Sequence, residues 1–334
     1  MANKLSKIET IALVGSETLL GREIRDIFAT SHFPARLSLI ASGADETGLL
    51  KEFEGEPTVL APLDSEALGD TKSAFLAGSP DSTRTALALG LETPLIDLTY
   101  AGEESPHARL RAPMVEPARH SVPADAVHVI ASPAAIAMAL ILNRLHPLHP
   151  ILRSVAHVFE PASERGKPGL DELQQQTVNL LSFKGQPKNI FDAQLAFNVL
   201  ARFGEEAPER LEDLELRIER HLATLLSAAS RAPIPSIRLI QAPVFHGHSI
   251  SLWVEFEENP GASEIERVLS SDLIDVRGDD QEPPNIVGVT GQEGIAVGAV
   301  TLDRNYPRAC WIWAVADNLR LMASNAVAVA RQLL

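Results

Sequence analysis

The sequence has a single cysteine, Cys310, and it has no long uncharged apolar run. One cysteine excludes an internal disulfide and any cysteine-rich metal site, so we expect a reducing, cytoplasmic setting. The longest uncharged apolar run covers residues 130–142. At about thirteen residues it is too short to span a bilayer. The first seven residues lead directly into a strand pattern, with no apolar signal-peptide segment.

Positive charge is also scarce, with 29 Lys and Arg residues against 44 Asp and Glu and a net charge of −15. This balance argues against a nucleic-acid partner, because phosphate binding needs clustered cations. The apolar share of 45% and the length of 334 residues are typical of a soluble protein with room for two domains.

A strand, a glycine turn and a helix open the chain. Residues 8–14 are a buried-strand run, and the segment Gly15 to Gly21 then begins a helix that reaches about Phe28. This order is typical of a doubly wound nucleotide-binding domain. Thr18, however, stands where a glycine would let a pyrophosphate approach, and Glu17 adds a negative charge. The loop is therefore either a dinucleotide site or a purely structural turn.

Short strands at residues 37–41, 73–77 and 95–98, with a helix over 82–89, continue the alternation of strand and helix. The pattern predicts a parallel sheet covered on both faces. Acidic residues, Asp45 and Glu46, follow the second strand. They either suit a ribose diol, which favours NAD over NADP, or are solvated loop charges.

A second helix start follows the apolar run 127–130. Ser132 suits the N-cap position and Pro133 suits the first turn. The first turn of a helix after a buried strand is where enzymes place a nucleophile or bind an anion. Here that turn holds Ala134, Ala135 and Ile136, and none of these side chains can do chemistry.

From residue 151 the pattern changes to longer strands with separate helices. In the predicted strand 250–256, Ile250, Leu252, Val254 and Phe256 share one face, while Ser251 and Glu255 point away. Helices are predicted over 169–181 and 208–228, which indicates an α+β domain with a mixed sheet and a dimer interface. The chain closes with a strand over 311–315 and a helix over 319–334 that could return to the first domain.

Five segments together resemble the aspartate-semialdehyde dehydrogenase family, most closely its Usg-type paralogues that lack the nucleophile. They are Val14 to Glu23, Ala131-Ser132-Pro133, Gln194 to Asn198, Ala242 to Ser249 and Val315 to Arg320. The resemblance implies a Rossmann-type doubly wound parallel sheet in residues 1–133 and 315–334. It implies an inserted α+β mixed-sheet dimerisation domain in 134–314 and a homodimer.

In that family a cysteine attacks the aldehyde carbon, and the resemblance assigns its position to Ala135. A methyl group cannot form the covalent intermediate. Cys310 lies far along the chain and is an implausible substitute. Phosphorylating semialdehyde dehydrogenase activity is therefore not expected.

The resemblance assigns the acid–base histidine to His248, which could move a proton. A histidine hydrogen-bonded at a strand start is the structural alternative. With His246 it could also form a metal-ligand pair, but no third ligand follows, so we expect no metal.

The remaining assignments concern the substrate and the cofactor. Glu160 takes the place of the family's glutamine and Glu219 that of its substrate-binding glutamate, although Glu219 is also explained as an exposed helix residue. Gln241 takes the place of the arginine that binds the substrate carboxylate. Ser132 is the second residue expected in the substrate pocket. Near Glu103 and Leu222 the family has cations. The residues expected near a cofactor are Gly15, Thr18, Leu19, Leu20, Gly21, Ser42, Ala77, Gly78, Pro133 and Asn318.

Three functions follow from these residues. The first is a catalytically silent family member, kept as a nucleotide-binding or regulatory dimer. The second is an active NAD- or NADP-dependent oxidoreductase that uses His248 on another carbonyl substrate. The third is an interaction partner of an active paralogue.

Overall fold

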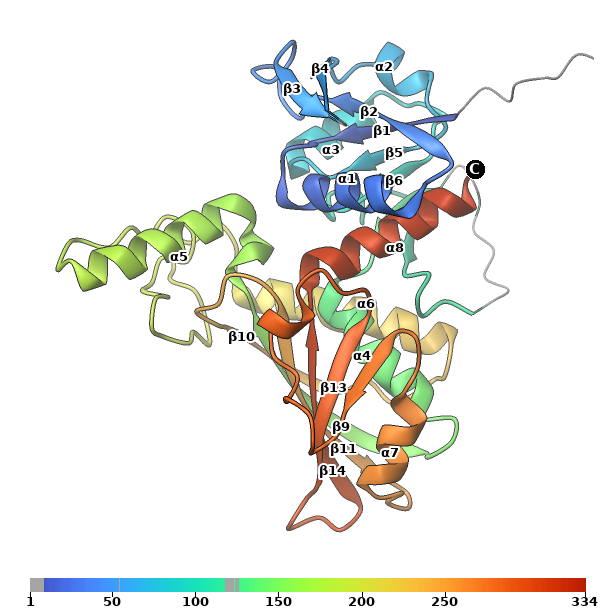
Figure 1. Ribbon diagram of the computed structural model, residues 1–334, viewed down its shortest axis with the longest axis vertical. Helices are drawn as coiled ribbons and strands as arrows, with labels where there is room; N and C mark the ends of the chain where they lie inside the picture. The colour runs from blue at the N-terminus through green and yellow to red at the C-terminus, as the bar shows by residue number, and fades with distance from the viewer. Residues whose placement is uncertain (1–8, 54, 118–122, 124–125) are drawn as a thin grey trace, which may run out of the picture. The chain divides into compact units, whose positions relative to one another are not determined.

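The computed structural model describes residues 9–53, 55–117, 123 and 126–334 (Figure 1). The chain divides into two compact units. The first unit comprises the described residues up to Pro113, a short segment that ends at Ile130, and Met322–Leu334. The second unit is centred on Ala131–Leu321.

The first unit is built on a six-stranded sheet in the order β2-β1-β5-β6-β8-β7. Every neighbouring pair in it is parallel, which confirms the predicted doubly wound sheet. A separate antiparallel hairpin joins β3 and β4. The elements are β1 (Glu9–Val14), α1 (Leu19–Ser31), β2 (Ala35–Ile40), β3 (Leu50–Phe53), β4 (Glu56–Val59), α2 (Ser65–Gly69), β5 (Ala74–Leu76), α3 (Pro80–Ala88), β6 (Leu95–Asp97), β7 (Ala108–Arg111), β8 (Val127–Ile130) and the part of α8 (Asn318–Gln332) from Met322 on.

Side chains of β1 alternate between two cores. Ile11 and Leu13 pack in one core with α1 and α8, while Ala12 and Val14 pack in the other with Leu68 of α2 and Ala86 of α3. A strand with apolar residues on both faces needs cover on both, since side chains alternate along it. The helices supply that cover.

The second unit contains a six-stranded mixed sheet in the order β10-β9-β11-β14-β13-β12. The two outer pairs are parallel and the central strands antiparallel. Its elements are α4 (Pro133–Leu145), β9 (Ile151–Glu160), η1 (Ala162–Arg165), α5 (Gly166–Leu181), α6 (Leu211–Ala228), β10 (Ser236–Gln241), β11 (His248–Phe256), α7 (Ala262–Leu269), β12 (Ile274–Arg277), η2 (Val287–Val289), β13 (Ile295–Leu302) and β14 (Ala309–Ala316).

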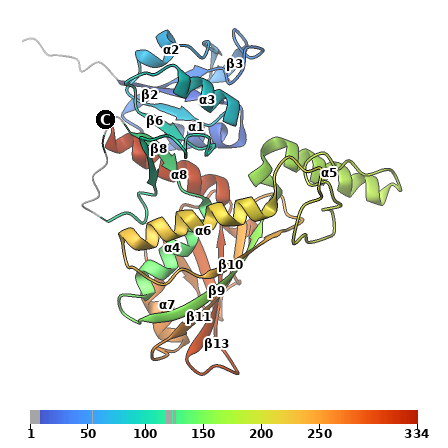
Figure 2. The same ribbon diagram turned by 180° about the vertical axis from the view of Figure 1, so that it is seen from behind.

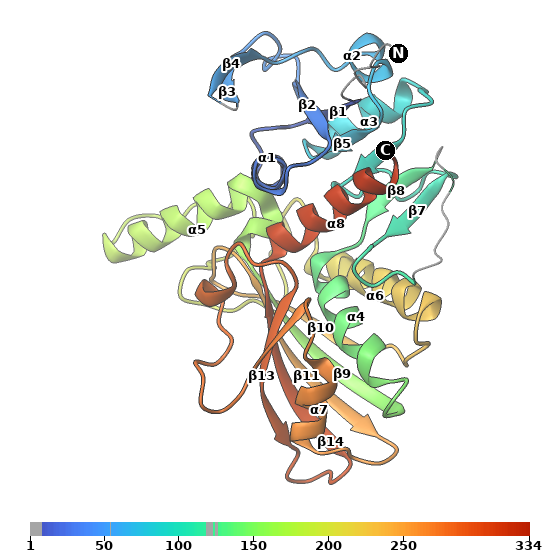
Figure 3. The same cartoon turned by 45° about the vertical axis from the view of Figure 1, so that its right-hand side comes forward.

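Helices α4, α6 and α7 cover one face of this sheet (Figures 2 and 3). Nearly all of α4 is buried, as its almost uninterrupted apolar sequence requires. Helix α5 projects from the end of the sheet in every view. Two buried side chains on α5 hold the loop that follows it: Glu172 accepts the main-chain N–H groups of Asn189, Ile190 and Phe191, and Gln176 those of Leu195 and Ala196.

The two faces of β11 carry the residues that the sequence predicts. Ile250, Leu252, Val254 and Phe256 are buried on one face, but Glu255 on the other face is buried as well. Its carboxylate accepts hydrogen bonds from Arg153 (2.6 Å) on β9 and Arg308 (2.8 Å), which offset the cost of removing it from water. Within the described residues, no helix is long and apolar enough to cross a membrane.

Candidate functional site

Three neighbouring strands of the second unit end in a row of polar side chains. Gln241 of β10 pairs in parallel register with Glu160 of β9. Strand β11 pairs with β9 in antiparallel register, with Ser249 opposite Phe159. Continuing this register by one residue places His248 of β11 beside Glu160 of β9. Residues at one level of a sheet share a face, and adjacent strands lie about 4.8 Å apart. The sheet therefore gathers three side chains that are up to 88 positions apart in the sequence.

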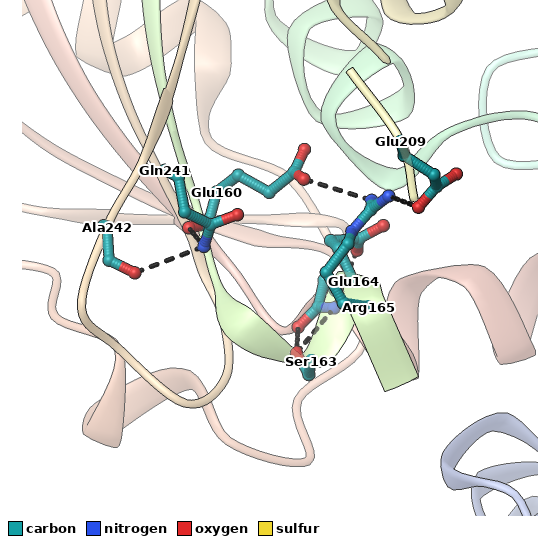
Figure 4. A network of polar contacts seen from close by, with 8 residues as sticks. Glu160, Ser163, Glu164, Arg165, Glu209, Gln241 and Ala242 are labelled. Carbon is teal, nitrogen blue, oxygen red and sulfur yellow. Dashed lines mark hydrogen bonds and ion pairs between the residues drawn. The ribbon is translucent and has the colours of Figure 1, made fainter. Parts of the chain in front are cut away.

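Glu160 is buried beside an arginine that follows it in the chain (Figure 4). Its Oε1 accepts a hydrogen bond from Nη2 of Arg165 over 3.2 Å, and Arg165 also pairs with Glu209. Burial raises the pKa of the Glu160 carboxyl to about 8, and the charge of Arg165 opposes that rise only in part. Such a carboxyl can hold or release a proton near neutral pH.

Gln241 uses its amide hydrogens on the main chain. Nε2 donates to the carbonyls of Glu160 (2.8 Å) and Ala242 (3.3 Å). Its buried Oε1 has no hydrogen-bond partner among the described residues. This side chain therefore offers a ligand an acceptor and no charge.

His248 is buried at the start of β11. The expectation of a hydrogen-bonded histidine at a strand start is wrong, since neither ring nitrogen has a partner within the described part of the chain. Burial lowers the pKa of the imidazole and the nearby Glu164 opposes this shift, so the neutral ring is favoured. A neutral imidazole presents one donor and one acceptor. No group of three metal-ligating side chains occurs in the described segments.

Asn318 joins the turn before β11 to the 3₁₀ helix η1. Its Oδ1 accepts from the main-chain N–H of Gly247 (2.9 Å), and its Nδ2 donates to Glu164 (2.7 Å) and Ser163 (3.1 Å). Gly247 has φ +83°, and a Cβ there would lie 2.8 Å from Ile286, so only glycine fits. Asn318 therefore fixes both segments that border His248.

Sequence reasoning missed the residues of η1, Ser163, Glu164 and Arg165. The signal available in the sequence was a polar cluster, Ser163 to Arg165, that follows a predicted strand and is closed by Gly166. That signal places the cluster near Glu160 but does not say which carboxylate Arg165 joins.

Ala135 lies in the fully buried first turn of α4, where no side chain carries a reactive group. Ser132 occupies the N-cap position, as predicted, and its hydroxyl makes no capping hydrogen bond. Its main-chain N–H instead donates to Nδ1 of the buried His221 on α6 over 2.9 Å.

Cys310 is distant from this row. It pairs with Val254 on β11, six positions beyond His248, which corresponds to about 20 Å along an extended strand. Its Sγ donates to Oδ1 of Asn259 over 3.3 Å, and burial raises the pKa of the thiol.

Glu219 is exposed on α6, and no described contact joins it to Glu160 or His248. Leu222, where the family has a lysine, is buried in the core. Glu103 is half-buried in the first unit, beside a turn held by Asp97, which accepts the main-chain N–H groups of Thr99 and Gly102.

The glycine turn of the first unit depends on close main-chain packing. Gly15 has φ +82°, and a Cβ on it would lie 2.4 Å from Cα of Gly78; a Cβ on Gly21 would lie 2.1 Å from the carbonyl oxygen of Gly15. Thr18 caps α1 by accepting from the N–H of Gly21 (3.0 Å), and its hydroxyl lies 2.7 Å from the carbonyl of Ala77. Thr18 therefore acts as a cap within a tightly packed turn.

Two features of this turn suit a phosphate group. The N–H groups of Leu19 and Leu20 have no partner among the described residues, at the N-terminus of a 13-residue helix. Glu17 does not oppose an anion as strongly as the sequence predicts, because its carboxylate pairs with Arg25 (2.7 Å) and Arg22 (3.5 Å). The residues present thus fit a dinucleotide pyrophosphate.

At the end of β2, Glu46 folds back and accepts from both the main-chain N–H (2.8 Å) and the hydroxyl (2.7 Å) of Ser42. This anchors a carboxylate where the sequence places a ribose. The last two residues expected near a cofactor, Pro133 and Asn318, belong to the second unit.

Residues 143–321 match the family model for the semialdehyde dehydrogenase dimerisation domain. An aspartate-semialdehyde dehydrogenase of Rickettsia bellii is 26% identical over 99% of both chains. A USG-1 protein homolog of Pseudomonas aeruginosa is 29% identical over 97% of both. The structure of a probable aspartate-semialdehyde dehydrogenase from Pseudomonas aeruginosa superposes with a TM-score of 0.86 at 26% identity, over 98% of both chains.

Proposed function

The chain belongs to the semialdehyde dehydrogenase family, and from that premise we propose that it is a catalytically silent member that binds small ligands. It does not carry out phosphorylating oxidation of an aldehyde. It serves as a homodimeric binding protein with two sites, the glycine turn for a nucleotide and the pocket around His248 for a small molecule.

The buried Ala135 is the observation on which this proposal rests. Covalent catalysis on an aldehyde needs a strong nucleophile beside an acid–base group. The first turn of α4 holds only apolar side chains, and Cys310 is about 20 Å along the strand from His248, where it bonds to Asn259. The chain thus lacks a thiol that could form the thiohemiacetal.

For the nucleotide, the N–H groups of Leu19 and Leu20 would hold the pyrophosphate, and the close packing of Gly15, Gly21 and Gly78 would keep the turn in the conformation that exposes them. A nicotinamide cofactor, if bound, supplies a hydride acceptor. Glu46, anchored by Ser42, would favour the free ribose hydroxyls of NAD over the 2′-phosphate of NADP.

A spectroscopic assay tests whether the protein lacks dehydrogenase activity. With aspartate semialdehyde, phosphate and NADP or NAD, we expect no dinucleotide reduction above background. Calorimetry in parallel should detect NAD binding more readily than NADP binding. Robust phosphate-dependent turnover would disprove the proposal.

A second function is favoured by the neutral, unpartnered ring of His248. A reductase that needs no covalent intermediate could use this imidazole to donate a proton to a carbonyl oxygen. Absence of both NAD and NADP binding at millimolar concentration would leave such an enzyme without a hydride source and would exclude it.

A further inference from the structure

The row of polar side chains around His248 lies beside an ion pair between a buried arginine and a carboxylate of the same chain. The side chain of Arg165 is 9% exposed, whereas that of its partner Glu209 is 48% exposed. Glu209 lies in the segment before α6, outside any helix or strand. The exposed carboxylate of Glu209 can return to water when it leaves, so the cost of separating this pair falls on the buried guanidinium.

The buried guanidinium cannot remain without an anion. Arginine stays protonated in proteins, so an Arg165 that lost Glu209 would need another partner. Glu160 contacts only Nη2, and the buried Nε of Arg165 has no partner among the described residues. The charged groups that act on Glu160 are Arg165, Arg217, Glu164 and Glu209, and Glu209 pairs with Arg165 from the exposed segment.

Uncharged partners for a ligand lie along the same row. Oε1 of Gln241 is an acceptor, and the ring of His248 offers a donor and an acceptor, all buried and unpartnered within the described residues. Gln241 and His248 flank Glu160 on the two neighbouring strands, which places their backbones about 10 Å apart. The two side chains extend from these backbones, so a ligand that contacts both must be shorter than that distance.

We propose that Glu209 is an internal stand-in for a ligand, and that Arg165 binds the carboxylate of a short hydroxy or oxo acid that displaces it. The hydroxyl or carbonyl group of the acid forms hydrogen bonds with His248 and Gln241. Arg165 is then the residue that selects for an anion in a pocket where Gln241 supplies no charge. The inference deepens the proposed small-molecule site and rests on it.

Titration calorimetry without any dinucleotide tests this assignment, with 3-hydroxybutyrate as the probe and 3-hydroxybutyramide as its neutral counterpart. We expect the acid to bind at least tenfold more tightly than the amide. Glu209→Gln should tighten binding of the acid about fivefold, because the competing carboxylate is gone. Arg165→Lys should weaken it at least tenfold, since lysine lacks the planar fork that binds carboxylates in two places.

Glu205→Gln is the matched control, because Glu205 is an exposed carboxylate of the same segment. It should bind the acid as the unchanged protein does. Equal effects of Glu209→Gln and Glu205→Gln, or equal binding of acid and amide, would overturn the inference. Either result would leave the absence of dehydrogenase turnover untouched, and turnover in the earlier assay would not affect this comparison.

Discussion

Gln241 and Glu160 end two neighbouring parallel strands in direct register, and the amide of Gln241 donates to the main-chain carbonyl of Glu160 over 2.8 Å. The amide at this position thus ties the two strand ends together instead of reaching for an anion. A positive charge beside Glu160 comes from Arg165, which follows it on η1 and donates a hydrogen bond to its carboxylate. Four predictions follow, which concern the first turn of α4, Glu160, the glycine turn and α5.

A thiol at position 135 should not restore activity. Ala135→Cys adds a sulfur to a fully buried helix turn, which should cost about 1–3 kcal/mol of stability. Phosphate-dependent dinucleotide reduction should stay at background, because Glu103 and Leu222 stand near the positions where the family resemblance implies cations. Ala139→Cys, one turn further along the buried face of α4, is the control and should show a similar loss of stability. Turnover in the first variant alone would mean that only the nucleophile is missing.

Glu160 should make stability depend on pH. Burial raises the pKa of its carboxyl from 4.5 to about 8, so between these values the folded protein keeps a proton that the unfolded chain has released. The free energy of unfolding should therefore fall as the pH rises from 5 to 8, by up to about 1.4 kcal/mol per unit.

Urea unfolding at pH 5, 6, 7 and 8 measures this slope, and Glu160→Gln should remove it. Glu219→Gln, at an exposed position on α6, should leave it unchanged. The same slope in the wild type and in Glu160→Gln would contradict the assignment of the proton to Glu160.

The glycine turn should not accept a side chain at position 21. A Cβ there would lie 2.1 Å from the carbonyl oxygen of Gly15, so Gly21→Ala must displace the main chain of the turn. We expect a loss of more than about 2 kcal/mol in stability, and loss of dinucleotide binding by calorimetry. Gly69→Ala is the control, because nothing lies within 4 Å of the added atom at the end of α2. Unchanged binding in Gly21→Ala would argue that the turn is not the nucleotide site.

The loop after α5 should depend on Glu172. Its carboxylate accepts three main-chain N–H groups, from residues 189–191, and Glu172→Ala would leave them without their partner. Urea unfolding should show a loss of about 3 kcal/mol, and limited proteolysis should cut the loop faster. The adjacent Asp171→Ala removes an exposed pair with Lys167 and should change stability by less than about 0.5 kcal/mol. Equal proteolysis of both variants would show that Glu172 does not hold the loop.

Local patterns predicted the framework because each depends on neighbouring residues. The strand–glycine–helix order predicted for residues 8–28 appears in the structure from Glu9 on, residue 8 lying outside the described residues, and the Ser132-Pro133 helix start appears as well. The parallel sheet of the first unit and the mixed sheet of the second are confirmed. The sequence did not predict the contacts of Ser132 and Glu255, because these come from His221 and from two arginines in distant segments.

By itself the sequence determined that position 135 carries a methyl group and that the one thiol lies far along the chain, since both follow from residue identity alone. Only the tertiary structure decided that Glu160, Gln241 and His248 form one row, and that Arg165 takes Glu209 as its second partner. Strand register sets which distant residues meet, and burial then sets the cost of each charge. Neither quantity can be read from a segment of chain considered alone.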